Sequence, residues 1–324
     1  MSATLDPESW VRFLDSDYLA TFLADGGSAV KFVVPIDEAP DRSIALLREA
    51  AHARGFACAD VHSDETRIHM ADRLLFQIND QIDWREVTER VLRRFLTDLS
   101  YAVPDAVDGS FIDSVAMTSG VDRGVLLMEM RKKVAADVFR QELLSKDFRV
   151  AMTQMCIAVL VGSEDSITTF ETVRRWLVGE LATVGEIKPY QIFTKINRSN
   201  ARHNFESLLH WLRFAGFPGL VVLIDIRRIG EPRNPKDGTV YYTKAAVLDA
   251  YEVLRQFIDG TDRMEGCLIT AFGDQGFLDE EPGSRGMGAY QALKFRIFDE
   301  VRDRFVANPL ASLVRVSTSP GPGA

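Results

Sequence analysis

The chain has 324 residues, of which 46% are hydrophobic and 26% are charged, as in an ordinary globular protein with a substantial core. Its formal net charge of −9 provides no overall positive field for a phosphate backbone, so unassisted nucleic-acid binding is not the expected function. The three cysteines, Cys58, Cys156 and Cys267, lie far apart in apolar surroundings, which excludes a disulfide framework and a CxxC metal site.

Neither a targeting signal nor a membrane span is predicted. Residues 1–10 lack the basic and apolar regions of a secretory signal, and no run approaches about 18 consecutive apolar residues. We therefore expect a cytoplasmic protein without a membrane partner. Residues 317–324 contain only Ser, Thr, Pro, Gly and Ala, a composition that predicts a short disordered tail.

The first sixty residues have the pattern of a strand, a helix and a second strand. Residues 31–35 (KFVVP) form a short β-branched run, and residues 43–55 place apolar side chains at helical spacing before a terminal glycine. Residues 56–61 (FACADV) are typical of a buried strand. Such a unit implies a parallel sheet with a right-handed crossover.

The middle of the chain is expected to be helical. Apolar residues recur with a period near 3.6 in residues 84–101 and 124–162. Residues 166–179 continue the pattern, with Ser166 as the expected N-cap. Residues 199–216 predict one more helix, which ends at a glycine.

The strongest strand signal comes after this helical region. Residues 219–225 (GLVVLID) form an uninterrupted hydrophobic run, as in a strand buried on both faces of a parallel sheet. A polar loop at residues 230–238 is followed by a predicted helix at 244–260 and a core strand at 266–272 (GCLITAF).

We therefore predict one α/β domain made from the two ends of the chain, with a parallel sheet flanked by helices and a helical insertion. The expected segments are the N-terminal part of the core, the insertion, the C-terminal part of the core and the tail, at residues 1–83, 84–198, 199–316 and 317–324.

The loop after the first predicted strand has the position of a phosphate-binding loop but not its residues. Nucleotide-hydrolysing proteins follow a strand with a loop of about eight residues and a helix, using glycines for close backbone approach and a lysine for the phosphate charge. Residues 35–43 contain neither glycine nor lysine. Pro35 and Pro40 also lack the backbone N–H groups that would donate to a phosphate.

The charge of this loop also opposes phosphate binding. Asp37, Glu38 and Asp41 are acidic, and only Arg42 and the start of the helix, near Ser43, counter their repulsion. The residues favour a solvated turn whose acids stabilise the helix dipole over a productive phosphate site.

Asp225 has the position of a magnesium-binding aspartate. Four apolar residues followed by an aspartate place a carboxylate at the edge of the sheet, where a Mg²⁺ ion would bridge the phosphates. In hydrolytic proteins a second acid follows at once to position water, whereas Ile226, Arg227 and Arg228 follow here. An aspartate at the end of a strand also commonly caps the next turn. Catalysis is therefore not expected, and Asp225 is a metal ligand only if Mg²⁺ binds.

Further segments occur in a characteristic order and spacing. They are residues 175–180 (RWLVGE), 214–225 (FAGFPGLVVLID), 285–293 (RGMGAYQAL) and 308–316 (NPLASLVRV). On these segments the chain resembles, from about residue 125 to 316, the P-loop domain family of BREX phage-resistance ATP-binding proteins, relatives of the AAA+ ATPases. The resemblance implies a P-loop NTPase (AAA+-like) fold, and residues 31–60 match its first strand–loop–helix–strand in pattern only.

The departures from the family pattern indicate a pseudo-ATPase. Where family members have GxxxxGK[ST], Pro35 and Pro40 stand at the glycines, Asp41 at the lysine and Arg42 at the Ser/Thr. The family's aspartate–glutamate pair becomes Asp225–Ile226, and its glycine–threonine–proline–glutamate segment is residues 273–276 (GDQG). We therefore expect no bound cofactor.

Arg285 lies in a segment that keeps the family pattern. In AAA+-like assemblies an arginine from a neighbouring subunit stabilises the charge of the transition state. Our hypothesis is that this chain offers Arg285 to an active paralogue. The alternative is that Arg285 caps the turn at Gly286 or pairs with Glu280 or Glu281.

Three functions remain open from the sequence. The leading one is a non-catalytic AAA+-like accessory subunit of a prokaryotic antiviral defence operon, with an active paralogous ATPase and a helicase as partners and only indirect DNA contact. The second is a genuine ATPase subunit that binds ATP and Mg²⁺ through a non-standard loop, with Asp225 on the metal and Arg42 in place of the lysine. Arginine is a poorer point charge in that role.

The third function is a DNA-associated scaffold that uses two local basic clusters. The clusters are Arg131, Lys132, Lys133 and Arg140, and Arg227, Arg228 and Arg233. His203 and His210 share a helical face, but no cysteine or carboxylate joins them at ligand spacing, so a metal site is not expected.

Overall fold

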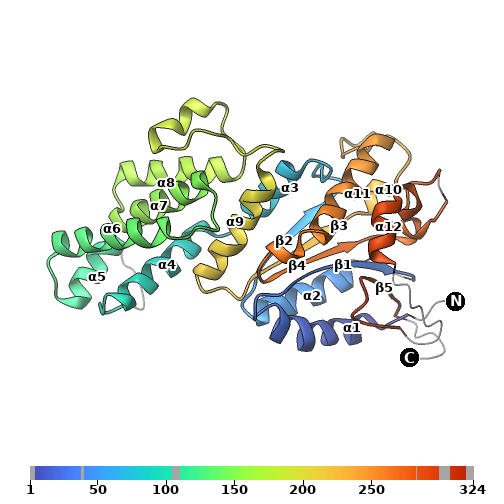
Figure 1. The fold of residues 1–324 in the computed structure, drawn as a ribbon, viewed down its shortest axis with the longest axis horizontal. Helices are drawn as coiled ribbons and strands as arrows, with labels where there is room; N and C mark the ends of the chain where they lie inside the picture. The colour runs from blue at the N-terminus through green and yellow to red at the C-terminus, as the bar shows by residue number, and fades with distance from the viewer. Residues whose placement is uncertain (1–3, 38–39, 104–109, 282, 299–306, 319–324) are drawn as a thin grey trace. The chain divides into compact units, whose positions relative to one another are not determined.

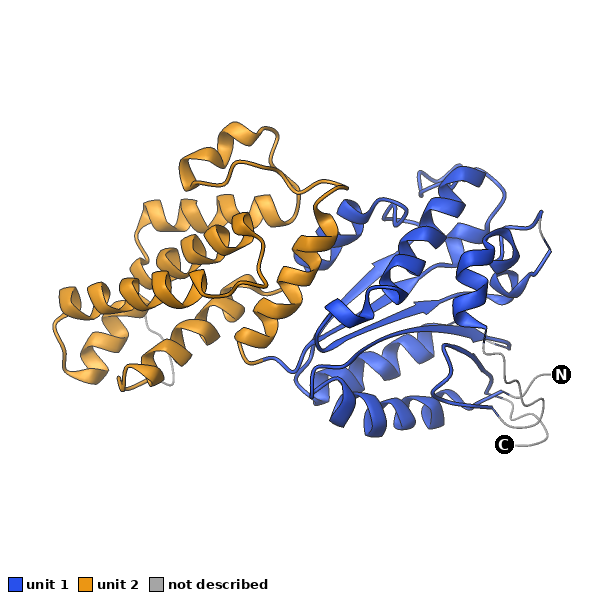
Figure 2. Cartoon of the chain, in the orientation of Figure 1, with its two compact units in different colours: residues 1–81, 217–324 blue, residues 82–216 orange. Residues whose placement is uncertain are grey.

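The structure is a computed structural model that describes residues 4–37, 40–103, 110–281, 283–298 and 307–318. The chain forms two compact units (Figure 2). Unit 1 combines residues 1–81 with residues 217–324, and unit 2 consists of residues 82–216.

Unit 1 is built on a five-stranded sheet in which every pairing is parallel, with the strand order β2-β3-β4-β1-β5. The strands are β1 (Ser28–Pro35), β2 (Ala57–His62), β3 (Leu220–Asp225), β4 (Cys267–Phe272) and β5 (Leu313–Val316). The predicted α/β class and parallel sheet are confirmed. The first and last thirds of the chain meet in this sheet, since β1 pairs with both β4 and β5.

Helices cover both faces of the sheet, with α1 and α2 on one face and α11 and α12 on the other (Figure 1). The helices of unit 1 are α1 (Pro7–Phe13), the π-helical η1 (Leu14–Phe22), α2 (Asp41–Ala53), α3 (Ala71–Asp80), α10 (Arg227–Gly230), α11 (Lys244–Ile258), α12 (Gln291–Ile297), and the short 3-10 segments η4 (Thr261–Arg263), η5 (Gln275–Leu278) and η6 (Met287–Ala289).

Alternate strand residues divide the core between these two faces. Val33, Leu223 and Phe272 pack in one cluster with Trp10 of α1 and Leu47 of α2. On the opposite face, Phe32 stacks on Phe277 with ring centroids 5.6 Å apart, and Tyr251 of α11 packs edge-on against Phe277 at 5.9 Å. All residues of β3 and β4 are buried, which confirms the expectation of strands covered on both sides.

Unit 2 is helical, as expected for the middle of the chain. Its elements are α4 (Trp84–Asp98), α5 (Phe111–Ser119), α6 (Arg123–Phe139), α7 (Lys146–Val161), α8 (Glu164–Leu177), η2 (Val184–Glu186), η3 (Lys188–Tyr190) and α9 (Ala201–Phe214). Among the described residues, every helix falls short of the length and apolar character that a membrane span requires.

The structure differs from the sequence expectation at α8 and α9. The N-cap of α8 is Ser163 and not Ser166, because the Ser163 hydroxyl accepts the Ser166 N–H at 3.3 Å. Helix α9, expected in the C-terminal part of the core, belongs to unit 2. Its Ser207 hydroxyl accepts the backbone N–H of Ser145, the N-cap of α7, at 2.9 Å.

The C-terminal segment continues past the expected start of the tail. Ser317 and Thr318 are held in place by hydrogen bonds to Asp37, while residues 319–324 lie outside the described residues. The predicted disorder is therefore wrong for Ser317 and Thr318, because their hydroxyl groups find an acceptor on the loop after β1.

Candidate functional site

A pocket lies at the edge of the sheet where β1, β3 and β4 end. The residues that line it are Pro35, Ile36, Asp37, Pro40, Arg227, Gly273, Asp274, Gln275 and Gly276. Strand β4 lies between β1 and β3 in the sheet, so the segments that follow these three strands meet here. The chain leaves β1 through α2 on one face and leaves β4 toward α12 on the other (Figure 1). Open α/β sheets bind ligands at such a switch point.

The loop after β1 turns toward the C-terminal segment. The Ile36 N–H donates to the Val316 carbonyl at 2.9 Å. The Asp37 carboxylate accepts the Ser317 hydroxyl at 2.8 Å and the Thr318 hydroxyl at 3.0 Å. This carboxylate is therefore engaged within the chain, and Glu38 lies outside the described residues.

The start of α2 lacks the features of a phosphate site. Pro40 occupies the N-cap position without a side-chain cap, and the Asp41 side chain next to it is 72% exposed. Arg42 pairs with Glu8 of α1 at 2.6 Å, and it does not line the pocket. Ser43 is fully buried, and its hydroxyl finds no hydrogen-bond partner among the described residues. In this structure Arg42 is therefore directed to α1 and not to the pocket.

An arginine of the chain itself occupies the position next to Asp225. Arg227 forms a two-pronged ion pair with this carboxylate, its Nε lying 3.0 Å from both oxygens and its Nη2 2.5 Å from Oδ2. The backbone N–H of Arg227 also donates to Asp225 Oδ1 at 3.0 Å. The Asp225 side chain is only 10% exposed. Both of its oxygens are thus committed to an internal cation.

This ion pair depends on the turn that follows β3. Ile226 leaves the extended conformation (φ −103°, ψ 4°) and leads into the short helix α10, which begins at Arg227. The turn lets a side chain two residues after Asp225 fold back over it. The hydrogen bond to Asp225, the attraction of this carboxylate, and the charges of Asp41 and Asp274 together raise the pKa of Arg227 above its ordinary value.

The loop after β4 closes the other side of the pocket. The Gly273 N–H donates to the Val33 carbonyl at 2.9 Å, and the Gln275 amide donates to the Ile36 carbonyl. Asp274 caps η5 by accepting the Phe277 N–H at 3.1 Å. The loops after β1 and β4 are therefore tied to each other directly.

The donor set of this pocket does not fit a magnesium–triphosphate complex. Mg²⁺ requires free oxygen ligands, and both Asp225 oxygens accept from Arg227. A triphosphate requires converging N–H donors and several cations, but Arg227 is the single cation among the described lining residues, and two prolines and the carboxylates of Asp37 and Asp274 line the pocket with it. The positive charge of Arg227 is offset by Asp225, so the remaining acids would repel phosphate.

The amino-acid sequence matches the model of a known protein family. Its residues 43–318 match the family model described as BREX system ATP-binding protein BrxC/D. This chain belongs to that family. The resemblance inferred from its motifs is confirmed, and the matched region begins at the last residue of the loop that lacks glycine and lysine. Searches among curated proteins and among solved structures found no significant match.

Arg285 of this BREX-family chain holds the loop between β3 and α11. Its Nη1 donates to the carbonyl groups of Glu231 and Tyr242, each at 2.9 Å, and lies 3.4 Å from that of Ile229. Its guanidinium also stacks 5.6 Å from the ring centroid of Tyr241. Among the described residues, Arg285 forms no ion pair with Glu280 or Glu281, and Glu280 pairs with Lys294 at 2.8 Å.

Each basic cluster has members that are engaged in ion pairs. Lys133 pairs with Asp98 at 3.0 Å and with Asp137 at 2.7 Å. Arg227 pairs with Asp225, and Arg228 donates to the Val240 carbonyl and to Glu231. These pairs weaken the argument for a DNA scaffold, because a phosphate backbone would have to compete with them.

The described residues show no histidine-based metal site either. His203 lies 3.6 Å from Glu206 on α9, but no group of three His, Cys, Asp or Glu side chains within the described ranges gathers as metal ligands. The three cysteines are free thiols, and burial raises the pKa of Cys58 to about 12.

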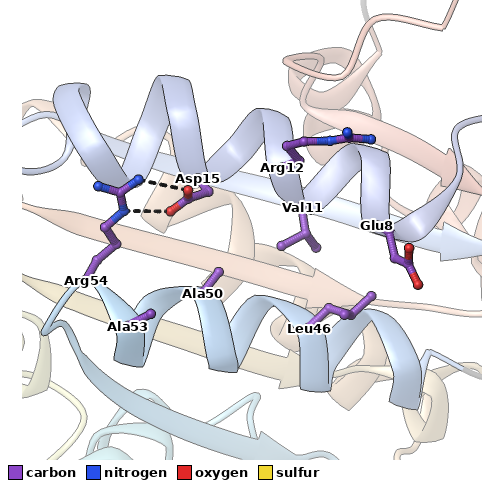
Figure 3. A pocket seen from close by; sticks show the side chains of 8 residues that line it. All are labelled: Glu8, Val11, Arg12, Asp15, Leu46, Ala50, Ala53 and Arg54. Atoms are coloured by element: carbon purple, nitrogen blue, oxygen red, sulfur yellow. Dashed lines mark hydrogen bonds and ion pairs between the residues drawn. The ribbon is translucent and has the colours of Figure 1, made fainter.

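A second hollow lies between α1 with η1 and α2 in unit 1 (Figure 3). Its floor includes Val11 and Leu46, and the Arg54 guanidinium spans it to the Asp15 carboxylate at 2.8 and 2.9 Å. The hydrogen bond from Arg54 lowers the pKa of Asp15. This ion pair fastens η1 to α2, and the apolar floor is the margin of the helix–helix contact, so we assign the hollow a structural role.

Proposed function

We propose that this chain is a non-hydrolytic, AAA+-like P-loop subunit of a BREX defence system. It acts in the cytoplasm beside an active paralogous ATPase and a helicase of the same operon. The observation that carries this proposal is the Arg227–Asp225 ion pair, which places a side-chain cation where an active relative would hold Mg²⁺.

The sheet supports the P-loop part of the proposal. A loop and a helix follow β1, an aspartate ends β3, and one strand separates them, so the loop after β1 and Arg227, which pairs with that aspartate, line the same pocket. This is the framework on which P-loop proteins combine a phosphate loop with a metal-binding aspartate. In this proposal the chain does not hydrolyse ATP because of the residues at the ends of its strands, and not because its sheet has a different architecture.

Calorimetry with Mg²⁺ and ATP tests the proposal directly. We expect no binding heat from the purified full chain, because Arg227 neutralises Asp225 and the described residues that line the pocket include no lysine. The matched control is Asp225→Ala, which should behave like the unmodified chain. Micromolar ATP binding that is lost in Asp225→Ala would overturn the proposal in favour of a genuine ATP-binding subunit.

Arg285 carries a second proposal, that it completes the active site of the paralogue. The test is ATP turnover by the paralogue mixed with this chain. If Arg285 acts across the interface, Arg285→Ala should reduce the stimulated turnover by about 100-fold or more.

A control is needed because Arg285 also holds its own loop through carbonyl groups. Tyr242→Phe removes the hydroxyl that donates to the Thr66 carbonyl at 2.7 Å, so it loosens the same loop while it keeps Arg285. Equal turnover losses in both variants, or no loss in Arg285→Ala, would restrict Arg285 to holding the loop.

A further inference from the structure

Helix α6 in unit 2 is apolar on two opposite faces. One face consists of Leu126, Met130, Val134 and Val138, all buried against the neighbouring helices α4, α5 and α7. The other face consists of Val125, Met128, Ala135 and Phe139, which we call the α6 stripe. Val125 is 45% exposed, Met128 65% and Phe139 51%. Contiguous exposed apolar residues of this kind mark interaction surfaces.

The spacing of the α6 stripe matches a helix–helix seam. Its positions 125, 128, 135 and 139, with Lys132 between them, are separated alternately by three and four residues. This is the spacing at which the side chains of one helix pack into the grooves of a second. At about 1.5 Å per residue the helix offers a straight surface of roughly 25 Å, enough for about four turns of a partner.

The charges beside the α6 stripe are positive and available. Arg131 and Lys132 are exposed and form no ion pair in the described part of the chain. Of the acids on the same helix, Asp137 pairs with Lys133 at 2.7 Å, and Glu129 is held by the Tyr101 hydroxyl at 2.6 Å while it keeps its charge. An approaching surface therefore meets apolar side chains with Lys132 between them and Arg131 beside them, and neither cation has an ion-pair partner in the described part of the chain.

We propose that the α6 stripe binds an acidic amphipathic helix of a partner protein. The apolar face of that helix covers Val125, Met128 and Phe139, and its carboxylates pair with Arg131 and Lys132. A second copy of α6 is a poor occupant, because antiparallel pairing about the middle of the helix would set Lys132 against its own counterpart. An anionic membrane is also a poor occupant, because segments that bind such membranes carry about four to eight Lys or Arg residues and the α6 stripe has only two free cations beside it.

The experiment uses the full chain and two fluorescein-labelled helical peptides. Both peptides carry leucines at alternating three- and four-residue spacing, and they differ only in flanking residues, which are glutamate in one and lysine in the other. Fluorescence anisotropy should show binding of the glutamate peptide, weakened by salt, and much weaker binding of the lysine peptide.

Three variants locate the binding on α6. Met128→Glu should weaken the glutamate peptide by about tenfold or more, because it places a charge in the apolar seam and repels the acids. Lys132→Glu should shift the preference toward the lysine peptide. Phe193→Ser is the matched control, since Phe193 is 59% exposed in the same unit but outside α6, and it should leave both affinities unchanged. Circular dichroism checks that each variant is folded.

Several outcomes would overturn the proposal. They are the absence of binding by the glutamate peptide, equal affinity for both peptides, and an unchanged affinity in Met128→Glu. Vesicles containing phosphatidylserine that retain the chain through Lys132 would reassign the surface to a membrane. Self-association in sedimentation that Met128→Glu abolishes would reassign it to a second copy of the chain.

Discussion

Replacing Arg227 with alanine is expected to lower the free energy of unfolding by about 3 kcal/mol. The substitution leaves the Asp225 carboxylate, only 10% exposed, without its cationic partner. The remaining neighbours are one backbone N–H at 3.0 Å and His62 at 3.9 Å. A buried charge that keeps so little compensation is costly to the folded state.

The reverse substitution provides the control. Asp225→Ala frees an arginine whose side chain is 37% exposed and can turn toward water, so we expect a loss of only about 1 kcal/mol. Urea unfolding followed by circular dichroism measures both variants. Equal losses in the free energy of unfolding for Asp225→Ala and Arg227→Ala would contradict the prediction that the buried carboxylate depends on the ion pair more than the arginine does.

Gly219→Ala is expected to have a still larger effect, about 4 kcal/mol or a complete loss of folded protein. A Cβ atom at Gly219 would lie 1.8 Å from the carbonyl oxygen of Gly266. The same oxygen accepts the Leu220 N–H at 2.9 Å, so the two backbones cannot separate without breaking the start of the β3–β4 pairing.

Gly230→Ala is the matched control for Gly219→Ala. Apart from its own helix and chain neighbours, no heavy atom of the described residues lies within 4 Å of the added Cβ, so the change should stay within about 0.5 kcal/mol. Thermal and urea unfolding of the two purified variants compare them. A Gly219→Ala protein as stable as the Gly230→Ala protein would show that the sheet can absorb the added atom.

Sequence patterns predicted best those elements whose residues are compatible with only one type of secondary structure. β3 and β4 are uninterrupted hydrophobic runs, and both are buried strands in the structure. The short strand β5 contains an arginine and is only half buried, so its pattern did not distinguish it from a loop. It becomes a strand because β1 pairs with it.

The N-terminal helix α1 was missed although its signals were present. Asp6 accepts the Ser9 N–H at 2.9 Å as N-cap, and Pro7 follows at the first helical position. Trp10 is fully buried in the core of unit 1. The cap, the proline and the apolar residues after them together predict this helix, and composition alone did not reveal it.

The sequence predicted which residues of the family pattern are missing from the site, but it did not predict the contacts between the residues that are present. The missing glycines, lysine and second acid are visible in the sequence. The Arg227–Asp225 pair depends on a turn at Ile226 that no local pattern indicated. The bond between Asp37 and Ser317 joins residues 280 positions apart, and only the completed sheet brings them together.

The strand order delays completion of the sheet while the chain is being synthesised. β1 pairs with β4 and β5, and the hydrogen bond between Ser28 and Cys267 joins residues 239 positions apart. At about 5–20 residues per second, a ribosome needs roughly 10–50 s to synthesise that interval. Unit 2 is continuous in sequence and can fold during this time, whereas the nascent β1 must wait with its edges unpaired until β4 emerges.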